Sequence, residues 1–225
     1  MMSPLEVITT GDGSHSILNT ALQETYHSRH GAVRESTHVF IDHGLRVAEL
    51  LNRETISILE VGFGTGLNTL LTLLESHRSG LTIRYESWEK FPLSLSLVDQ
   101  LNYGAIVGDE ASFRLLHEAP WDTPVAIRPH FELYKRAKDI LTDPLEGSYD
   151  LVYYDAFAPS KQPEMWTAEM LRKTTSVLSP GGLWVTYCAK GQVKRDLAAL
   201  GLTVETLPGP PGKKEMTRAT RSSVT

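Results

Sequence analysis

The chain has 225 residues, enough for one domain whose core buries roughly 70% of the surface that the unfolded chain exposes. Its apolar fraction of 41% and charged fraction of 22% are typical of a folded globular protein and exclude disordered, collagen-like and coiled-coil chains. The single cysteine, Cys188, excludes an internal disulfide and a cysteine-rich zinc site, and it fits a reducing compartment.

The net charge of −5, taken as a sum, argues against a nucleic-acid partner, because phosphate binding requires positive charge. The distribution is uneven, however. Seven basic and three acidic residues give residues 190–225 a charge of +4, which leaves −9 on the first 189 residues. The N-terminus lacks the basic start and apolar stretch of a signal peptide, and no apolar cluster has the roughly 20 residues that span a bilayer. We therefore expect a cytoplasmic protein with an acidic body and a basic C-terminal end.

Strands and helices alternate along the chain. Short apolar runs predict strands, and apolar positions at helical spacing predict helices. In chain order, the sequence predicts a short helix over 17–26, a helix over 39–51, a strand over 56–61, a helix over 67–76, a strand over 81–89, a helix over 91–102, strands over 131–137 and 149–154, a helix over 167–178, a strand over 183–189, a helix over 192–200 and a strand over 202–207.

This alternation predicts an α/β fold with a mostly parallel central sheet and helices on both faces. The helix predicted over 167–178 ends at proline-glycine-glycine 180–182. We expect a single domain over 1–225. Residues 1–38 have weak periodicity and read as an N-terminal extension, and residues 103–128, which contain Pro120 and Pro124, read as an insertion between the second and third strands.

The strand over 56–61 ends in the glycine turn GFGTG, at the place where nucleotide-type cofactors bind in α/β proteins. A dinucleotide fingerprint requires G-x-G-x-x-G, and Leu67 stands at its sixth position, which makes a nicotinamide dehydrogenase the weakest candidate. The spacing is instead G-x-G-x-G with an acid, Glu60, two residues before it. This pattern resembles the first motif of class I S-adenosylmethionine (SAM) methyltransferases, in which the turn cradles the amino-acid part of SAM.

Acidic residues follow the next two strands in the order that this fold requires. Glu89, which lies 23 residues after Gly66, suits the acid that binds the ribose hydroxyls, with Glu86 as a close competitor. Asp139 has the position expected of the acid that recognises the adenine amino group. The cofactor contacts expected from the resemblance are Glu60, Gly62, Phe63, Gly64, Thr65, Gly66, Asn68, Glu89, Lys90, Asp139 and Asp155.

The fourth strand is followed by DAFAPSKQPEMW over 155–166. Ligands of open α/β sheets bind beyond the carboxyl ends of the strands, so Asp155 and Phe157 are expected beside the methyl group of SAM. The alternative to a functional role is a structural one: the segment is a turn that ends the strand, in which the aspartate is a cap and the aromatic side chain only fills space.

Five segments together resemble one family. They are GFGTGLN (62–68), WEKFPL (88–93), DAFAPSKQPEMW (155–166), PGG (180–182) and GKKEM (212–216). The family is the SAM-dependent methyltransferase that completes the 5-methylaminomethyl-2-thiouridine modification at the tRNA wobble position, and the resemblance covers nearly the whole chain. The family occurs alone or fused to an FAD-dependent oxidase. The length of this chain predicts the stand-alone form, whose substrate is a tRNA with a 5-aminomethyl uridine.

The resemblance implies that a primary amine attacks the methyl group of SAM. Asp155 would then accept the proton of the amine or only orient it, and Phe157 would stack on or wall the base. The start of the chain, with Glu35, Ser36, His38 and Phe40, also resembles the family and is expected to wall the pocket.

Basic residues that follow the fourth-strand motif and fill the C-terminal end are the expected contacts to RNA phosphate. They are Lys161, Lys190, Lys194, Arg195, Lys213, Lys214 and Arg218. The competing interpretation is a solvated basic face without a partner.

Two other functions remain open. One is an aminopropyltransferase of the spermidine-synthase type, or another small-amine methyltransferase on the same fold, and the other is a non-catalytic module that binds SAM or RNA. The histidine pairs His27/His30 and His38/His43 have poor spacing for a closed metal site, so no metal is expected. Cys188, which falls in the predicted strand over 183–189, is expected to be a small core residue.

Overall fold

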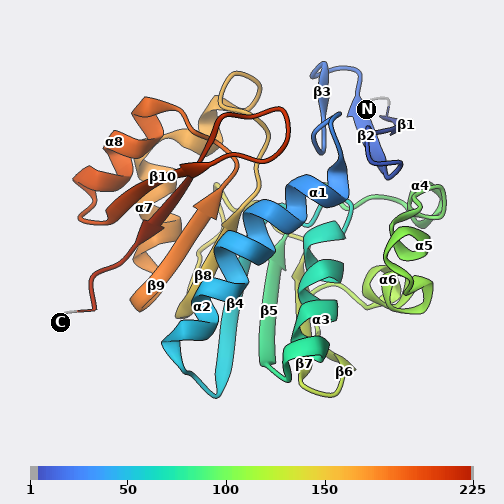
Figure 1. Ribbon diagram of the computed structural model, residues 1–225, viewed down its shortest axis with the longest axis horizontal. Coiled ribbons are helices and arrows are strands. Elements are labelled where there is room, and N and C mark those ends of the chain that lie inside the picture. Colours follow the sequence, from blue (N-terminus) through green and yellow to red (C-terminus); the bar gives the residue numbers. More distant parts are fainter. Residues whose placement is uncertain (1–4, 224–225) are drawn as a thin grey trace.

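The computed structural model describes residues 5–223 (Figure 1). The strands of this range are β1 (Leu5–Thr9), β2 (His15–Asn19), β3 (Glu24–Thr25), β4 (Thr55–Val61), β5 (Thr82–Trp88), β6 (Pro124–Arg128), β7 (Phe131–Arg136), β8 (Tyr149–Tyr154), β9 (Leu178–Thr186), β10 (Thr203–Pro208) and β11 (Glu215–Thr220).

The main sheet runs in the order β10-β11-β9-β8-β4-β5-β7-β6, and β1, β2 and β3 form a separate antiparallel sheet. Strands β9, β8, β4, β5 and β7 are parallel to one another. At one edge β6 pairs antiparallel with β7, and at the other β11 pairs antiparallel with both β9 and β10. The predicted α/β fold with a mostly parallel sheet is confirmed, with antiparallel strands added at both edges.

The helical segments are α1 (Ala32–Ser36), the π-helical η1 (Thr37–Leu45), α2 (Arg46–Ala48), the 3₁₀ turn η2 (Glu49–Leu51), α3 (Leu67–Ser79), α4 (Leu95–Val98), α5 (Tyr103–Val107), α6 (Glu110–Glu118), the 3₁₀ turn η3 (Pro163–Trp166), α7 (Ala168–Ser176) and α8 (Gly191–Ala199). Segments α1 to η2 follow one another without a break and form one long helical stretch over residues 32–51 (Figure 1). Within residues 5–223, no helix combines the length and the apolar character needed to cross a membrane.

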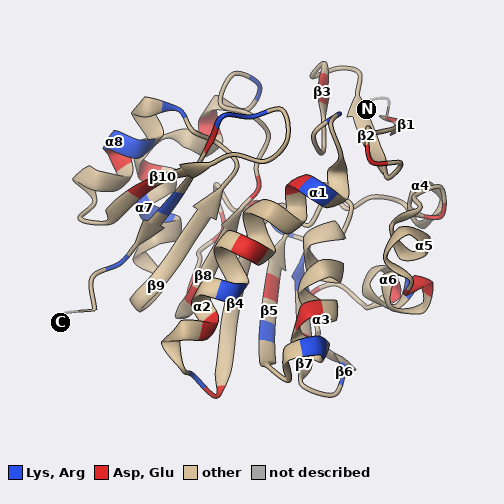
Figure 2. Cartoon of the chain, viewed as in Figure 1, with Lys and Arg blue, Asp and Glu red and all other residues tan. Residues whose placement is uncertain are grey.

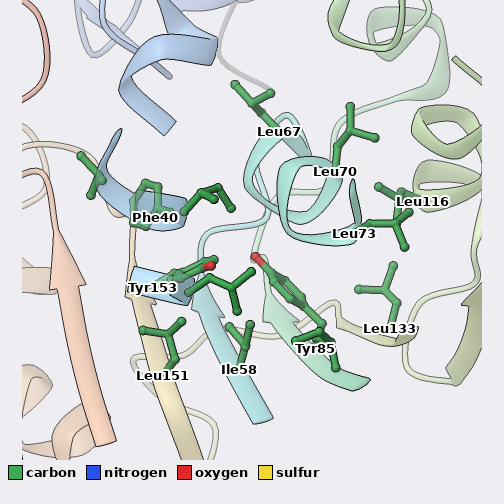
Figure 3. Packing of buried hydrophobic residues seen from close by; sticks show 14 of the residues in the cluster. Phe40, Ile58, Leu67, Leu70, Leu73, Tyr85, Leu116, Leu133, Leu151 and Tyr153 are labelled. Atoms are coloured by element: carbon green, nitrogen blue, oxygen red, sulfur yellow. The ribbon is translucent and has the colours of Figure 1, made fainter. Parts of the chain in front are cut away.

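Helices cover both faces of the main sheet, because its central strands are apolar on both sides. The long helical stretch and α3 pack on one face, where the ring centroids of Phe40 and Tyr153 lie 5.0 Å apart. Leu70 of α3 belongs to the same buried cluster as Ile58 and Tyr85 of the strands (Figure 3). Helices α7 and α8 pack on the other face, against a second cluster of buried apolar side chains. The prediction of helices on both faces is confirmed.

The prediction of a helix over 17–26 is wrong, because this segment contributes to strands β2 and β3. The Asn19 side chain accepts hydrogen bonds from the backbone N–H groups of Ala21 (3.1 Å) and Leu22 (3.0 Å) and so closes a turn directly after β2. A side chain that satisfies these donors replaces the bonds that a helix would have made.

The helix predicted over 91–102 shortens to the four residues of α4. The chain is extended at Ser94, and Pro92 precedes it. At the other end, Asn102 accepts a hydrogen bond from the His15 N–H (2.8 Å) and donates one to the Gly13 carbonyl (2.9 Å). These bonds tie the segment to the small N-terminal sheet. The expected insertion over 103–128 holds α5, α6 and the edge strand β6.

At the C-terminal side, β11 has no counterpart among the predicted elements. It begins at Glu215 and lies between β9 and β10. Strand β9 begins at Leu178, before the proline-glycine-glycine segment, and ends at Thr186. Cys188 is therefore buried just beyond the strand in which it was expected.

The core packing predicts the effect of truncating the central strand. Ile58 on β4 has no exposed surface, so Ile58→Ala should lower the free energy of unfolding by about 2–5 kcal/mol. Ile106→Ala is the matched control, because 46% of Ile106 is exposed and its loss should cost about 0.5 kcal/mol or less. Urea denaturation of both variants measures the two values, and equal losses would contradict the assignment of the core.

Candidate active site

A cavity of about 1220 Å³ opens at the carboxyl ends of β4, β5 and β8. This is the edge at which open α/β sheets bind their ligands. Its volume exceeds the roughly 300–1,000 Å³ of an ordinary small-molecule pocket, which leaves room for a cofactor and part of a second ligand. The small N-terminal sheet contributes part of the cavity wall, through residues of β1, β2 and β3.

The register of the parallel strands brings three predicted site residues to this edge. Val61 at the end of β4 pairs with Trp88 at the end of β5 and with Tyr154 at the end of β8. The next residues of the three strands all line the cavity, and they are Gly62, Glu89 and Asp155.

The glycine turn after β4 leaves backbone open to the cavity. Gly62 (φ +94°) and Gly64 (φ +49°) both have left-handed backbone angles that disfavour other residues. A Cβ atom on Gly62 would lie 3.1 Å from the Asp155 carbonyl oxygen, and one on Gly64 would lie 3.2 Å from the Tyr26 ring. Phe63, Thr65 and Asn68 line the cavity from the same loop and helix, so this side of the cavity fits a cofactor that needs close approach to backbone.

Two of the predicted cofactor residues lie behind the loop and do not line the cavity. Gly66 packs against His117, whose Nε2 atom would be 2.8 Å from a Cβ on this glycine. Glu60 is fully buried and accepts hydrogen bonds from Ser87 (2.6 Å) and Thr69 (3.2 Å). Burial raises the pKa of Glu60 to about 8. Both residues therefore support the loop from behind, and their direct contact with the cofactor stays a prediction.

Thr65 at the centre of the loop is held by two histidines. His27 Nε2 lies 2.7 Å from the Thr65 hydroxyl, and His117 Nε2 donates to the Thr65 carbonyl at 3.1 Å. Burial lowers the pKa of each histidine to about 4, so both are neutral near pH 7. Sequence reasoning missed this clamp, because the histidines lie 38 and 52 residues from Thr65 along the chain.

The two acids that competed for the ribose position have different surroundings. Glu89 lines the cavity and accepts hydrogen bonds from the N–H groups of Gly64 (3.0 Å) and Phe91 (2.8 Å), while burial raises its pKa. Glu86 instead accepts bonds from Arg136 (3.1 Å) and Tyr149 (2.9 Å) within the structural framework. The geometry therefore favours Glu89 as the acid that faces a ligand.

Lys90 and Asp139 both line the cavity and are paired with each other. Their charged groups lie 2.7 Å apart, and the hydrogen bond from Lys90 lowers the pKa of Asp139. Both remain within reach of a cofactor, as a pair and not as two independent charges.

Asp155 begins the turn after β8, where its carboxylate accepts a hydrogen bond from the Asn68 side chain at 2.8 Å. Burial raises the pKa of Asp155 to about 7. Phe157 packs edge-to-face on Tyr26, with ring centroids 5.0 Å apart, and its carbonyl accepts a hydrogen bond from Trp166 Nε1 at 2.8 Å. Asp155 and Phe157 both line the cavity, so the turn contributes a carboxylate and an aromatic ring to its wall.

Lys213, expected as a phosphate contact, lies in the cavity wall and is paired with Glu35 at 2.6 Å. Its ammonium group also lies 3.7 Å from the centre of the Tyr187 ring. Glu35 and Tyr187 therefore engage this lysine in the structure, and its contact with RNA phosphate stays a prediction. The sequence predicts Glu35 in the wall of the pocket, whereas no pattern in the sequence indicates Tyr187.

Most of the remaining predicted RNA contacts lie at or in α8 or in the β10–β11 hairpin, and they divide into paired and exposed cations (Figure 2). Lys194 is paired with Glu215 (2.8 Å) and Arg218 with Glu205 (2.8 Å). Arg195 donates to Gln192 (2.8 Å). Lys190 and Lys214 are exposed, and Lys161 lines the cavity.

The chemistry of the cavity fits a SAM-like cofactor. It combines a glycine-lined backbone, a carboxylate at the end of β5 and a second carboxylate at the end of β8. Among residues 5–223, no group of three or more histidine, cysteine, aspartate or glutamate side chains is arranged to hold a metal ion.

Comparison with known families agrees with this chemistry. A family model described as S-adenosyl-L-methionine-dependent methyltransferase matches residues 134–222. The chain is 33% identical, over 88% of its length, to the tRNA 5-methylaminomethyl-2-thiouridine biosynthesis bifunctional protein MnmC of Pseudoalteromonas atlantica, and 31% identical, over 97%, to that of Cupriavidus metallidurans. It spans about a third of the length of these curated relatives (31% and 34%).

Two solved structures resemble the whole chain. The structure of MNMC2 from Aquifex aeolicus matches with a TM-score of 0.76 and 28% identity over 99% of this chain and 71% of that one. Spermidine synthase from Thermotoga maritima matches with a TM-score of 0.54 and 13% identity, over 97% of this chain and 72% of that one, a likeness that shows the fold alone.

The open backbone at Gly64 predicts a selective loss of cofactor binding. Gly64→Val should abolish SAM binding, because a branched side chain at φ +49° would be strained and would fill the space beside Tyr26. Gly80→Val is the matched control, since Gly80 has φ +75° but nothing within 4 Å of its Cβ position. Calorimetric titration with SAM measures both variants. Equal SAM affinity in the two variants would contradict the assignment of the loop.

Proposed function

We propose that this chain is an S-adenosyl-L-methionine-dependent methyltransferase that methylates the amine of 5-aminomethyl(-2-thio)uridine at the tRNA wobble position. The product is 5-methylaminomethyl(-2-thio)uridine. The observation that carries the proposal is the juxtaposition of Asp155 and Phe157 with the glycine turn in one cavity. The names of the relatives support the choice of substrate.

SAM is the cofactor, and when bound it supplies an electrophilic methyl group on a sulfonium. Because Gly62 and Gly64 have no side chain, SAM would approach the backbone closely there, and Glu89 would bind its ribose hydroxyls. The Lys90–Asp139 pair lies in the same wall, where Asp139 would reach the adenine amino group.

Asp155 is the group that we assign to the amine. An alkylamine has a pKa near that of lysine, about 10, so most of it is protonated at neutral pH and has no free lone pair. With its own pKa near 7, Asp155 is better matched to receive a proton than an ordinary surface aspartate. Asn68 fixes the carboxylate, so Asp155 both orients the amine and accepts its proton.

The aromatic residues of the cavity suit a nucleobase. Unstacked RNA bases are held on aromatic faces, and Phe157 with Tyr26 offers such a surface beside Asp155. Lys161 lines the cavity near them and would contact the phosphate of the flipped nucleotide. A tRNA substrate also leads us to propose a cytoplasmic location.

The aminopropyltransferase alternative is not favoured. Its support is a likeness of fold at 13% identity, whereas the tRNA-modifying relatives reach 33%. Product analysis separates the two reactions, because one adds a methyl group to tRNA and the other an aminopropyl group to a polyamine.

The role of Asp155 predicts a specific kinetic defect. Asp155→Asn should reduce the turnover of 5-aminomethyl-uridine tRNA by about 10²–10⁴-fold while SAM binding persists, because an amide cannot accept the proton. In the parent enzyme, kcat/KM should rise as the pH rises through about 7, where the Asp155 carboxyl loses its proton. This inflection should be absent in the variant.

Mass analysis of wobble nucleosides and SAM calorimetry measure these effects. Asp99→Asn, at an exposed carboxylate outside the main cavity, is the control and should leave turnover unchanged. Unchanged turnover in Asp155→Asn would remove Asp155 from the mechanism.

The exposed cations predict salt-dependent tRNA binding. Lys190→Glu with Lys214→Glu should weaken tRNA binding and reduce the slope of log affinity against log salt by about one for each phosphate that is no longer neutralised. Arg84→Glu is the control, because this exposed cation lies near the amino end of β5, away from the cavity. A flat salt profile of the parent protein would count against the assignment of this surface.

A further inference from the structure

The carboxylate of Glu35 is buried in the cavity wall and holds a cation. Its side chain is 7% exposed. One oxygen accepts the Ser28 N–H at 2.6 Å, and the other accepts the Lys213 ammonium at 2.6 Å. The Tyr187 ring faces the same ammonium at 3.7 Å. A carboxylate combined with an aromatic face is a binding site for an ammonium group.

This site stands beside the residues assigned to the reaction. Tyr187 donates a hydrogen bond to the carbonyl of Ala156, the residue after Asp155, at 2.8 Å. The charges of Glu35 and Lys213 also shift the pKa of Asp155, in opposite directions, which places them within electrostatic reach of its carboxylate. An ammonium seated on Glu35 therefore lies near the proposed proton acceptor.

Lys213 is held less firmly than Glu35. It lies in the loop between β10 and β11, and a third of its side chain is exposed. It can move away without breaking a strand, but a buried carboxylate left without a partner is strongly destabilising. Only another cation can replace Lys213 at low cost.

We propose that Glu35 and Tyr187 form the binding site for the ammonium group of the substrate, and that Lys213 occupies this site until a cationic substrate replaces it. This inference rests on the proposed function and deepens it. The exchange of one ammonium for another preserves the charge balance of the cavity wall, whereas an unmodified uridine has no cation to offer. Glu35 is thus the residue that selects a wobble uridine bearing an amine.

The exchange also gives Lys213 a second position. Once displaced, its ammonium group is solvated on the same loop as the exposed Lys214. The substrate ammonium then passes one proton to the Asp155 carboxylate, which leaves a neutral amine with its lone pair available.

The experiment measures binding and kinetics for two tRNAs, one with 5-aminomethyl-2-thiouridine and one with unmodified uridine at the wobble position. Glu35→Gln should raise the Kd and KM of the aminomethyl tRNA by about 10-fold or more, toward the values of the unmodified tRNA, with a smaller change in kcat. Lys213→Met should tighten binding of the aminomethyl tRNA and leave that of the unmodified tRNA unchanged or weaker.

Matched controls are Glu164→Gln, a carboxylate on the rim of the same cavity, and Lys214→Met, the exposed neighbour. Glu164→Gln should leave the discrimination between the two tRNAs unchanged, and Lys214→Met should weaken both tRNAs alike. Unchanged SAM affinity and thermal midpoint in Glu35→Gln would confirm that the variant is folded. If Glu35→Gln fails this check, Lys213→Met and Tyr187→Leu carry the same test, the latter with an expected loss of discrimination.

Two results would overturn the inference while the proposed function stands. One is full discrimination by a folded Glu35→Gln variant, and the other is weaker binding of the aminomethyl tRNA by Lys213→Met. If the parent enzyme binds SAM but never methylates the aminomethyl tRNA, the proposed function fails, and the assignment of Glu35 fails with it.

Discussion

The register of β4 between β5 and β8 is the constraint on which the site depends. Hydrogen bonds continue the ladder beyond the strands, from Gly62 N–H to the Trp88 carbonyl (2.9 Å) and from Asp155 N–H to the Val61 carbonyl (3.1 Å). A slip by one residue would turn every side chain of a strand to the opposite face and separate these groups. The apolar residues that fix the register therefore position the chemistry, although none of them takes part in it.

Much of this arrangement could be predicted from sequence. Strands β4, β5 and β8 are compact apolar runs with turn residues at their ends, and their predicted bounds differ from the observed ones by one residue or none. The glycine turn and the DAFAP segment each lie within a few consecutive residues. Local patterns of this kind are independent of the rest of the chain, which explains why sequence was sufficient there.

The failures share a different cause, because each depends on contacts between distant segments. Strand β11 forms because its residues pair with β9 and β10. The helix expected over 91–102 is shorter than predicted, because Asn102 forms hydrogen bonds with the segment of the N-terminal sheet. Lys213 and Glu35 are 178 residues apart, so composition counted Lys213 as a free positive charge. Lys194 and Arg218 are paired as well, with acids of the same end of the chain, so three of its seven basic residues are engaged in ion pairs.

The unusual carboxyls of the site share one physical origin. Burial raises the pKa of Glu60, Glu89 and Asp155, which means that this part of the protein disfavours uncompensated negative charge. Such an environment favours ligands that bring positive charge, because a cation restores the ionised form of a neighbouring carboxyl. A sulfonium and an alkylammonium are both of this kind. The buried carboxyls around the cavity are thus the part of the acidic body that attracts a cationic ligand. The ion pair between Glu35 and Lys213 shows that the fold already binds one ammonium group there.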